Sequence, residues 1–350
     1  MYGTGHTAGM HAALGPAMVA LALQLEPVPG RPYSRVEGPI PVRVAAPCEL
    51  VMMDASGKDL ARAGVGAGEI DLAQVLPAVR GIPCAVRVQA LIGARPEGPP
   101  LVVTPLEVRP TIRTMVDLRP DGTTRFTRII GWGDRLLDPS NPAHVEASKS
   151  WEKADPSPRS GFRVDVDQDV VFETTAGPIR FCMRPDMAPA TARNFVELAA
   201  RGFYDGTIVH RVVAKGRGGK PFVIQGGDPT GTGDGGPGYD LMLEPSVLPH
   251  DFGVLSMARN DWPDSAGSQW FVALTREETA RLDGQYCAFG EAVEGADAIL
   301  AIERGEIADE STGRPRAPVT VTRAYAQPSK PWVPGTGRPE ARVVRPGAPR

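Results

Sequence analysis

The stretch from residue 210 to 238 limits the possible folds of this chain more than any other part. It opens with a His-Arg pair, crosses a basic insert rich in glycine, continues into a second short apolar run and ends in a segment dominated by glycine. Short runs of β-branched and aromatic residues between glycines and prolines predict strands joined by turns. If residues 209–212 and 222–225 are neighbouring strands, Arg211 can project toward the same site as the aromatic ring and the amide that end the second run. We therefore expect a β-rich fold that places a fixed cation, an aromatic wall and an amide side by side.

Several motifs accompany this stretch in a fixed order. They are VFETTAGPIRF (residues 171–181), FYDGTIVHR (203–211), FVIQGGDPTGTG (222–233), GVLSMARNDWPDSAGSQWF (253–271) and LDGQYCAFG (282–290). Together they resemble the cyclophilin-type peptidyl-prolyl cis-trans isomerases, over roughly residues 164–325, about half of the chain. The resemblance implies a mainly β fold, an eight-stranded closed barrel capped by two helices. The residue pattern predicts these helices at 188–202 and 296–304.

The resemblance also implies which residues act on the substrate. Arg211 would be catalytic, and Gln225 would orient it and bind the substrate backbone. The apolar socket for the proline ring would consist of Phe222, Val223, Phe271 and Leu282, bordered by His210 and Tyr286. The backbone of Ala258, Arg259 and Asn260 would bind the residue before the proline, and Gln269 would line the adjacent groove. The implied partners are proline-containing peptides and unfolded protein clients.

The implied reaction requires no cofactor. Rotation about an Xaa-Pro bond has a barrier of ~18–20 kcal/mol and takes tens of seconds or more without a catalyst. When the C–N bond twists, conjugation is lost and the nitrogen gains a lone pair, so a donor aimed at that nitrogen lowers the barrier. A guanidinium stays charged at any working pH and offers several donors in a fixed fork. We therefore expect Arg211 to act without a cofactor, a metal ion or a covalent step.

Two features depart from the family pattern. Arg281 precedes the LDG motif, where many members carry a tryptophan associated with tight cyclosporin binding, so we expect weak binding of this drug. The insert at residues 214–221 is longer than the usual turn. Its Lys215, Arg217 and Lys220 would lie near the groove and favour acidic peptides.

Other interpretations of these residues are weaker. The competing function is a non-catalytic protein that uses the groove only to bind a proline-containing partner or to act as a scaffold, but the complete set of implied catalytic and socket residues favours an enzyme. The segment GGDPTGTGDGG lacks the ending of a phosphate loop, and its threonines replace the acidic ligands of a calcium loop. Asp165, Asp167 and Asp169 alternate along a predicted strand, which favours an exposed acidic face over a metal site.

Charge and hydropathy narrow the partners and the location. A net charge of −3 argues against nucleic acid or an anionic membrane as the main partner. No run approaches the ~20 apolar residues of a membrane span. Residues 1–24 contain a short apolar core without a preceding Lys or Arg, so we expect a cytoplasmic protein. Periplasmic or extracellular export is the alternative if residues 1–24 act as a signal peptide.

The length of 350 residues predicts about two domains. Residues 1–31 would be an apolar leader followed by an entry segment rich in proline and glycine. Residues 32–110 would be a smaller β-sandwich-like domain of unknown function. Residues 69–80 of that domain fit a short helix or another strand. A hairpin and linker would span 111–160, the isomerase domain 161–326 and a disordered tail 327–350, because the tail has few apolar residues. Binding of clients or of a cell-envelope component by 32–110 is a further possibility, and pairing of Cys48 with Cys84 stays open.

Overall fold

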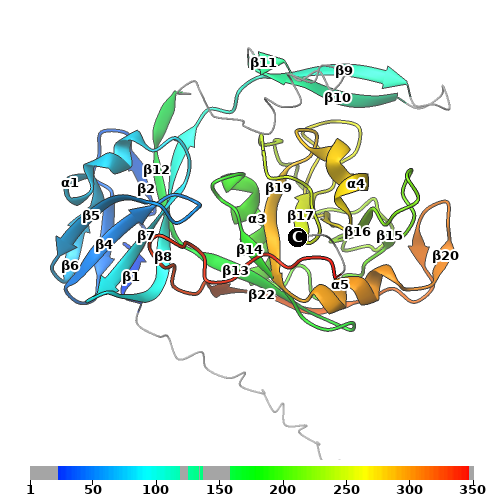
Figure 1. Ribbon diagram of the computed structural model, residues 1–350. Helices are drawn as coiled ribbons and strands as arrows, with labels where there is room; N and C mark the ends of the chain where they lie inside the picture. The colour runs from blue at the N-terminus through cyan, green and yellow to red at the C-terminus, as the bar shows by residue number, and fades with distance from the viewer. Residues whose placement is uncertain (1–22, 119–124, 134, 137–157, 347–350) are drawn as a thin grey trace, which may run out of the picture.

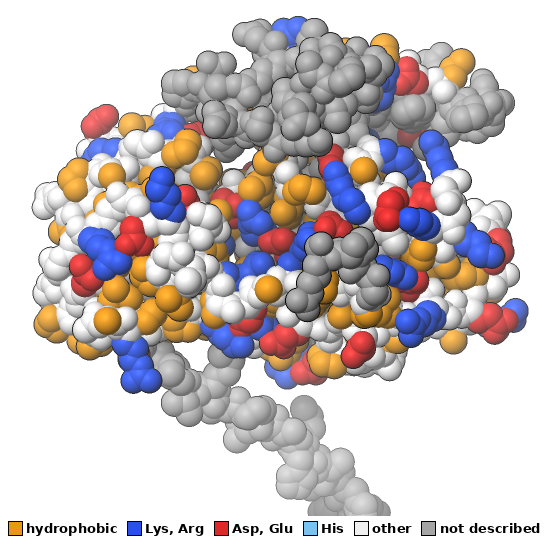
Figure 2. Space-filling view, viewed as in Figure 1, with side chains coloured by type: hydrophobic (Ala, Val, Ile, Leu, Met, Phe, Trp, Pro, Cys, Tyr) orange, Lys and Arg blue, Asp and Glu red, His pale blue; other side chains and the backbone are white. Residues whose placement is uncertain are grey.

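The computed structural model describes residues 23–118, 125–133, 135–136 and 158–346 (Figure 1). Within these ranges the fold is mainly β, as predicted, and two β-rich units lie side by side with a hairpin above the second. No helix in the described ranges is long and apolar enough to span a membrane. On the face shown in Figure 2, acidic and basic side chains are interspersed over both units. Residues 1–22 of the predicted leader and most of the predicted linker lie outside the described residues.

The N-terminal unit consists of two sheets around one core. A three-stranded sheet has the order β1 (Leu25–Pro27), β3 (Pro41–Val44), β6 (Gly68–Asp71). A six-stranded sheet has the order β2 (Tyr33–Arg35), β12 (Arg159–Val166), β8 (Arg95–Glu107), β7 (Val86–Ile92), β4 (Cys48–Met53), β5 (Asp59–Val65). Val42 from the first sheet and Leu50 and Val88 from the second are buried in the same cluster. This arrangement matches the predicted sandwich-like domain.

Local sequence explains the turns of this unit. Asp54 accepts hydrogen bonds from the backbone of Ser56 and Lys58, which forms the turn after β4. For residues 69–80 both alternatives occur in succession. Strand β6 ends at Asp71, whose carboxylate accepts from the Ala73 amide and so caps α1 (Leu72–Val75). Pro77 then begins the 3-10 helix η1 (Pro77–Gly81).

The C-terminal unit is one sheet of eight strands. Its order is β15 (Arg211–Val213), β16 (Val223–Gly226), β18 (Trp270–Ala273), β17 (Val254–Met257), β19 (Ala288–Glu294), β14 (Ile179–Met183), β13 (Gln168–Thr174), β22 (Val321–Pro328). The predicted closed barrel is wrong, because the sheet curls without a ladder between its edge strands β15 and β22. An isolated bridge between Ile208 and Thr320 links the two edges instead. The outer pair β20 (Ile307–Asp309) and β21 (Arg314–Pro315) lies beside β15.

Both predicted helices are confirmed. Helix α3 (Pro189–Ala200) has Pro189 in its first turn and packs against β13, β19 and β22. Helix α5 (Ala296–Glu303) packs against β14, β15 and β16. The short helix α4 (Arg276–Thr279) continues into the 3-10 helix η2 (Ala280–Leu282), which carries the segment before the LDG motif. Cys182 and Cys287 are buried thiols, and no disulfide joins Cys48 to Cys84.

The predicted hairpin is also present. Strand β9 (Ile112–Leu118) pairs antiparallel with β10 (Arg125–Trp132), which also pairs with β11 (Arg135–Leu136). The turn predicted between β9 and β10 lies outside the described residues. Ile129 and Trp132 are buried in the core cluster of the C-terminal unit. The hairpin is therefore docked on that unit.

The prediction of an exposed acidic face is wrong for two of its three aspartates. Strand β12 belongs to the N-terminal sheet and β13 to the C-terminal sheet, so the chain changes units at Asp167. Asp167 and Asp169 are buried. The reason is a pair of arginines, since Arg87 binds Asp167 and Arg180 binds Asp169.

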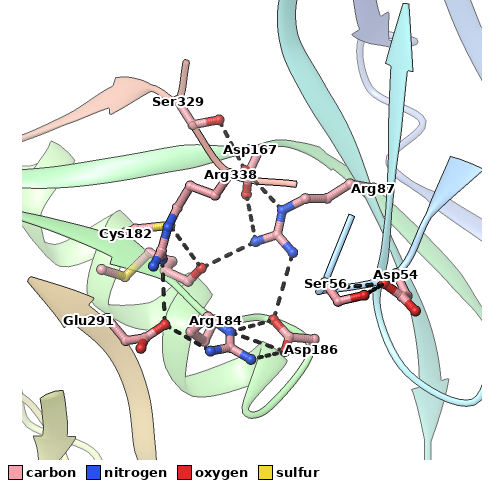
Figure 3. A network of polar contacts seen from close by, with 11 residues as sticks. Asp54, Ser56, Arg87, Asp167, Cys182, Arg184, Asp186, Glu291, Ser329 and Arg338 are labelled. Carbon is pink, nitrogen blue, oxygen red and sulfur yellow. Dashed lines mark hydrogen bonds and ion pairs between the residues drawn. The ribbon is translucent and has the colours of Figure 1, made fainter. Parts of the chain in front are cut away.

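A network of ion pairs joins the two units (Figure 3). Arg87, on β7 of the N-terminal unit, is fully buried and its Nε lies 3.1 Å from Asp167 Oδ2. Its other nitrogens reach the Met183 carbonyl at 3.3 Å and Asp186 Oδ1 at 3.7 Å, both in the C-terminal unit. The network continues through Arg184, Glu291 and Arg338. Buried charges must be paired to be tolerated, so this network fixes how the units meet.

The predicted disordered tail is wrong for residues 327–346. Strand β22 extends to Pro328, and Trp332 packs against Val51, Met53 and Leu91 of the N-terminal unit with 3% of its surface exposed. The segment also meets the turn after β4 backbone to backbone, since a Cβ at Gly57 (φ +84°) would lie 2.1 Å from the Gly337 nitrogen. Composition predicted disorder because the segment has few apolar residues. The segment is ordered because one buried tryptophan and several paired arginines hold it on the two units. The ion pairs are Arg338 with Glu291, Arg342 with Asp251 and Arg345 with Glu303.

Candidate active site

The register of β15 and β16 brings the predicted catalytic pair together. Arg211 lies directly opposite Gln225, and its Nη1 donates to Gln225 Oε1 at 3.0 Å. Gln225 Nε2 donates in turn to Gln269 Oε1 at 3.0 Å. Gln269 Nε2 donates to the carbonyls of Gly233 and Gly235, at 2.7 and 2.9 Å. This chain of hydrogen bonds leaves each amide one consistent orientation and holds the guanidinium fork in place.

The predicted socket residues form one apolar cluster beside this chain. Val223, Phe271 and Leu282 are at most 5% exposed, with Phe222, Ala258, Tyr286 and Val213 packed around them. The rings of Phe271 and Tyr286 meet edge to face with centroids 5.7 Å apart. Hydrophobic burial of this kind makes a rigid wall, which suits the ring of a proline better than a flexible side chain.

A cavity of about 490 Å³ adjoins the socket. Gln225, Ala258, Arg259, Asn260 and Gln269 line it, together with the glycine-rich segment 233–240. The Arg259 guanidinium lies 4.8 Å from the centroid of the Tyr286 ring, so the wall between cavity and socket is a stacked cation and ring. The segment predicted to bind the residue before the proline thus faces a space large enough for it.

His210 lies close to the cavity, since a Cβ at Gly233, which lines it, would be 3.9 Å from His210 Nε2. Successive side chains of an extended segment point to opposite sides, so His210 and Arg211 face different ways. His210 is 6% exposed, and neither ring nitrogen has a hydrogen-bond partner among the described residues. Burial lowers its pKa, so the imidazole is neutral at pH 7.

The structure adds a support that sequence reasoning missed. His250 is stacked on Phe271, with ring centroids 5.7 Å apart and planes at 16°. Its Nδ1 lies 3.0 Å from Asp283 Oδ1, and its Nε2 lies 2.9 Å from Ser256 Oγ. Burial would raise the pKa of Asp283, but hydrogen bonds from His250 and Arg276 lower it to about 2. The carboxylate only accepts, so Nδ1 carries the proton and Nε2 accepts from the serine.

These three residue types also occur in hydrolytic triads. Here the arrangement is structural, because Ser256 is 0% exposed and His250 is 1% exposed. A substrate carbonyl has no path to the serine oxygen. Among the described residues no group of three or more His, Cys, Asp or Glu side chains is placed to hold a metal ion.

The sheet, the socket and the fixed guanidinium together define a site for an apolar ring held beside a cation. A family model described as cyclophilin type peptidyl-prolyl cis-trans isomerase/CLD matches residues 169–326. Peptidyl-prolyl cis-trans isomerase CYP18-2 of Arabidopsis thaliana is 39% identical over 160 residues, which are 44% of this chain and 91% of that protein. The human peptidyl-prolyl cis-trans isomerase-like 1 is 39% identical over 162 residues, 45% of this chain and 91% of that protein.

A crystal structure of a cyclophilin type peptidyl-prolyl cis-trans isomerase of Cryptosporidium parvum is 30% identical, with a TM-score of 0.41. The match covers 45% of this chain and 98% of the Cryptosporidium chain. From its identity to curated relatives over most of their length, this chain belongs to the cyclophilin-type peptidyl-prolyl cis-trans isomerases. The N-terminal unit and the hairpin lie outside the matched residues.

Proposed function

We propose that this chain isomerises Xaa-Pro bonds in peptides and unfolded protein clients, with Arg211 as the catalytic residue. The observation that carries the proposal is the chain of hydrogen bonds from Arg211 through Gln225 to Gln269, beside an apolar socket. The proline ring fills the socket formed by Phe222, Val223, Phe271 and Leu282. The residue before the proline lies along Ala258–Asn260.

The geometry favours the twisted amide over both planar forms. Gln225 accepts from Nη1 at one edge of the guanidinium, so the remaining N–H groups of Arg211 can donate to the substrate. In the twisted state the proline nitrogen regains its lone pair and accepts such a donor, whereas the planar amide nitrogen does not. Stabilisation that exists only in the transition state raises kcat. No proton is transferred, so the neutral His210 takes no part as an acid or base.

The decisive experiment compares turnover with binding. We expect the purified chain to accelerate the cis-to-trans exchange of a short Ala-Pro reporter peptide. Arg211→Ala should reduce kcat/KM by about 10²-fold, as expected for loss of a preorganised charged donor. Arg316→Ala, which removes an exposed arginine of the same unit, is the matched control and should retain the activity.

The alternative is a non-catalytic binder or scaffold, which this experiment also identifies. A binder would give chemical-shift changes with the proline peptide but leave the exchange rate at its uncatalysed value. That result with a folded protein would overturn the enzymatic proposal.

We also infer weak cyclosporin binding. The Arg281 guanidinium lies 4.3 Å from the Phe222 ring centroid, where it brings a hydrated charge to the rim of an apolar socket. Arg281→Trp should restore an apolar rim and lower the inhibition constant for cyclosporin at least tenfold, which corresponds to ~1.4 kcal/mol. Nanomolar inhibition of the unmodified chain would contradict this inference.

A further inference from the structure

Three guanidinium groups gather at one rim of the socket. They belong to Arg211 on β15, Arg217 in the insert and Arg281 on η2. Arg281 stacks over the ring of Phe222. Partial burial lowers the pKa of Arg281, the positive charges of Arg217 and Arg211 lower it further, and Tyr286 and Glu278 act in the opposite direction, so the other two guanidinium groups and the Glu278 carboxylate are within electrostatic reach of Arg281.

None of these three arginines forms a salt bridge with any residue that the structure describes. Several other arginines of this unit are paired, for example Arg180, Arg184, Arg276 and Arg345, but Arg259 and Arg314 also form no salt bridge with a described residue. Clustered like charges repel, and three cations with one nearby carboxylate, that of Glu278, leave a net positive field that attracts an anion. The rim is therefore prepared for a negative group supplied from outside the chain.

The acidic residues near this rim are already engaged. Glu277 pairs with Lys220 at 2.8 Å. Glu278 is 5% exposed, accepts from the Lys220 backbone amide and fills the space beside Gly216 and Gly218. Of the three basic residues expected near the groove, Lys220 is therefore paired at the surface with Glu277. Arg217 and Arg281 keep unpaired charges.

The position of this rim indicates which substrate residue it meets. In the proposed function, the residue before the proline lies along Ala258–Asn260, in the cavity that Gln269 also lines. Arg281 and Arg217 do not line that cavity, and Arg281 covers Phe222 at another side of the socket. The chain that leaves the proline ring in the other direction passes this rim.

We propose that Arg281 and Arg217 form a carboxylate subsite for the substrate residue that follows the proline, so that Xaa-Pro-Glu and Xaa-Pro-Asp sequences are the preferred substrates. This inference rests on the proposed isomerase function. Guanidinium groups bind carboxylates through charge-assisted hydrogen bonds, often with two contacts at once. Because the rim is exposed to solvent, the preference should be modest, roughly five- to tenfold in kcat/KM.

The test compares Ala-Ala-Pro-Glu with Ala-Ala-Pro-Gln, two reporters of the same shape that differ in charge. Exchange rates are measured with the full chain at 20 mM and 500 mM salt. We expect the glutamate peptide to be favoured by roughly five- to tenfold at low salt, and the ratio to fall toward one at high salt. In the double variant R281Q/R217Q the ratio should fall to about one even at low salt. K215Q, which removes the same charge from an exposed residue of the same insert, should keep the ratio.

Three outcomes would overturn the subsite. These are equal rates for both peptides, a preference that survives R281Q/R217Q, and a preference that appears only when the glutamate precedes the proline. The proposed function stands in all three cases, because both peptides are still turned over. Failure to turn over either peptide would instead reject the proposed function.

Discussion

His250 shows how a single side chain holds the socket in shape. It presents a flat face to Phe271, and its two nitrogens are fixed by Asp283 and Ser256. Burial lowers the pKa of His250, although Asp283 acts in the opposite direction. The neutral ring can therefore donate at one nitrogen and accept at the other. Protonation of His250 at Nε2 would break the hydrogen bond that Ser256 donates and would place a buried positive charge against the ring of Phe271.

A pH-dependent loss of stability follows from this histidine. Its pKa is lower in the folded chain than the value of about 6.5 in an unfolded chain. Below about pH 6.5 the unfolded state therefore binds more protons, and the free energy of unfolding falls as the pH decreases. Urea unfolding at pH 7.5 and pH 5.5 should show this fall, and His250→Asn should make it shallower. Parallel pH curves for the two proteins would contradict the assignment, and His210→Asn provides a second buried imidazole for comparison.

Residue patterns could predict only part of this site. Arg211 and Gln225 were predictable because strand alternation and the flanking motifs place them together. His250 and Asp283 are 33 residues apart and contact each other only through the fold, so no local pattern connects them. The buried Asp167 was misjudged for the same reason, since its partner Arg87 lies 80 residues away in the other unit.

The β9–β10 hairpin is the element that the family pattern does not supply. Its free edge docks on Gln285, which accepts from the Ile129 amide at 2.8 Å and donates to the Ile129 carbonyl at 2.9 Å. Arg259, whose guanidinium stacks on Tyr286, also reaches the Thr127 carbonyl at 3.5 Å. A side-chain amide thus completes the strand edge as a neighbouring strand would. The hairpin braces the wall between the socket and the cavity.

Removal of the Gln285 amide tests this brace. Gln285→Ala leaves the buried backbone groups of Ile129 unpaired, which costs about 1–3 kcal/mol. We expect faster hydrogen exchange at the Ile129 amide and a raised KM for the reporter peptide, with kcat little changed. Gln285→Glu, which keeps the acceptor and loses the donor, should lie between the two proteins. Unchanged exchange at Ile129 in Gln285→Ala would show that the hairpin is held by other contacts.

At this scale the sequence predicted strands and helices well but misjudged how segments join. Short apolar runs located β15 and β16, and the residue pattern located α3 and α5. The closure of the sheet and the path of residues 327–346 depend on distant contacts, such as Trp332 against Val51. Such contacts leave no periodic signal in the local sequence.

The whole molecule behaves as two units locked by buried charge. Arg87 contributes its guanidinium to Asp167 and Asp186, and the Trp332 ring lies 4.0 Å from its central carbon. Ser329 also donates to Asp167, at 3.0 Å. The N-terminal unit, the C-terminal unit and the C-terminal segment therefore meet at Arg87.

Loss of Arg87 should uncouple the units. Arg87→Ala leaves the buried carboxylate of Asp167 without its arginine, while Asp186 keeps Arg184, and loss of one partner of a buried ion pair typically costs about 3–5 kcal/mol. We expect the single urea transition of the full chain to shift to lower urea and to separate into two. Arg43→Ala removes an exposed arginine of the same unit and should leave the curve nearly unchanged. A single transition at the original midpoint in Arg87→Ala would show that the network contributes nothing to the coupling.

The path of the C-terminal segment has a consequence for biosynthesis. A ribosome completes the strands of the N-terminal unit long before it adds Trp332, yet the side chains of Val51, Met53 and Leu91 share their buried cluster with that residue. Until then the nascent chain carries an exposed apolar patch close to Arg87. The partners of Arg87, Asp167 and Asp186, are also synthesised later. The unit that is translated earlier is thus completed only after translation has passed residue 332, when almost all of the later unit has also been synthesised.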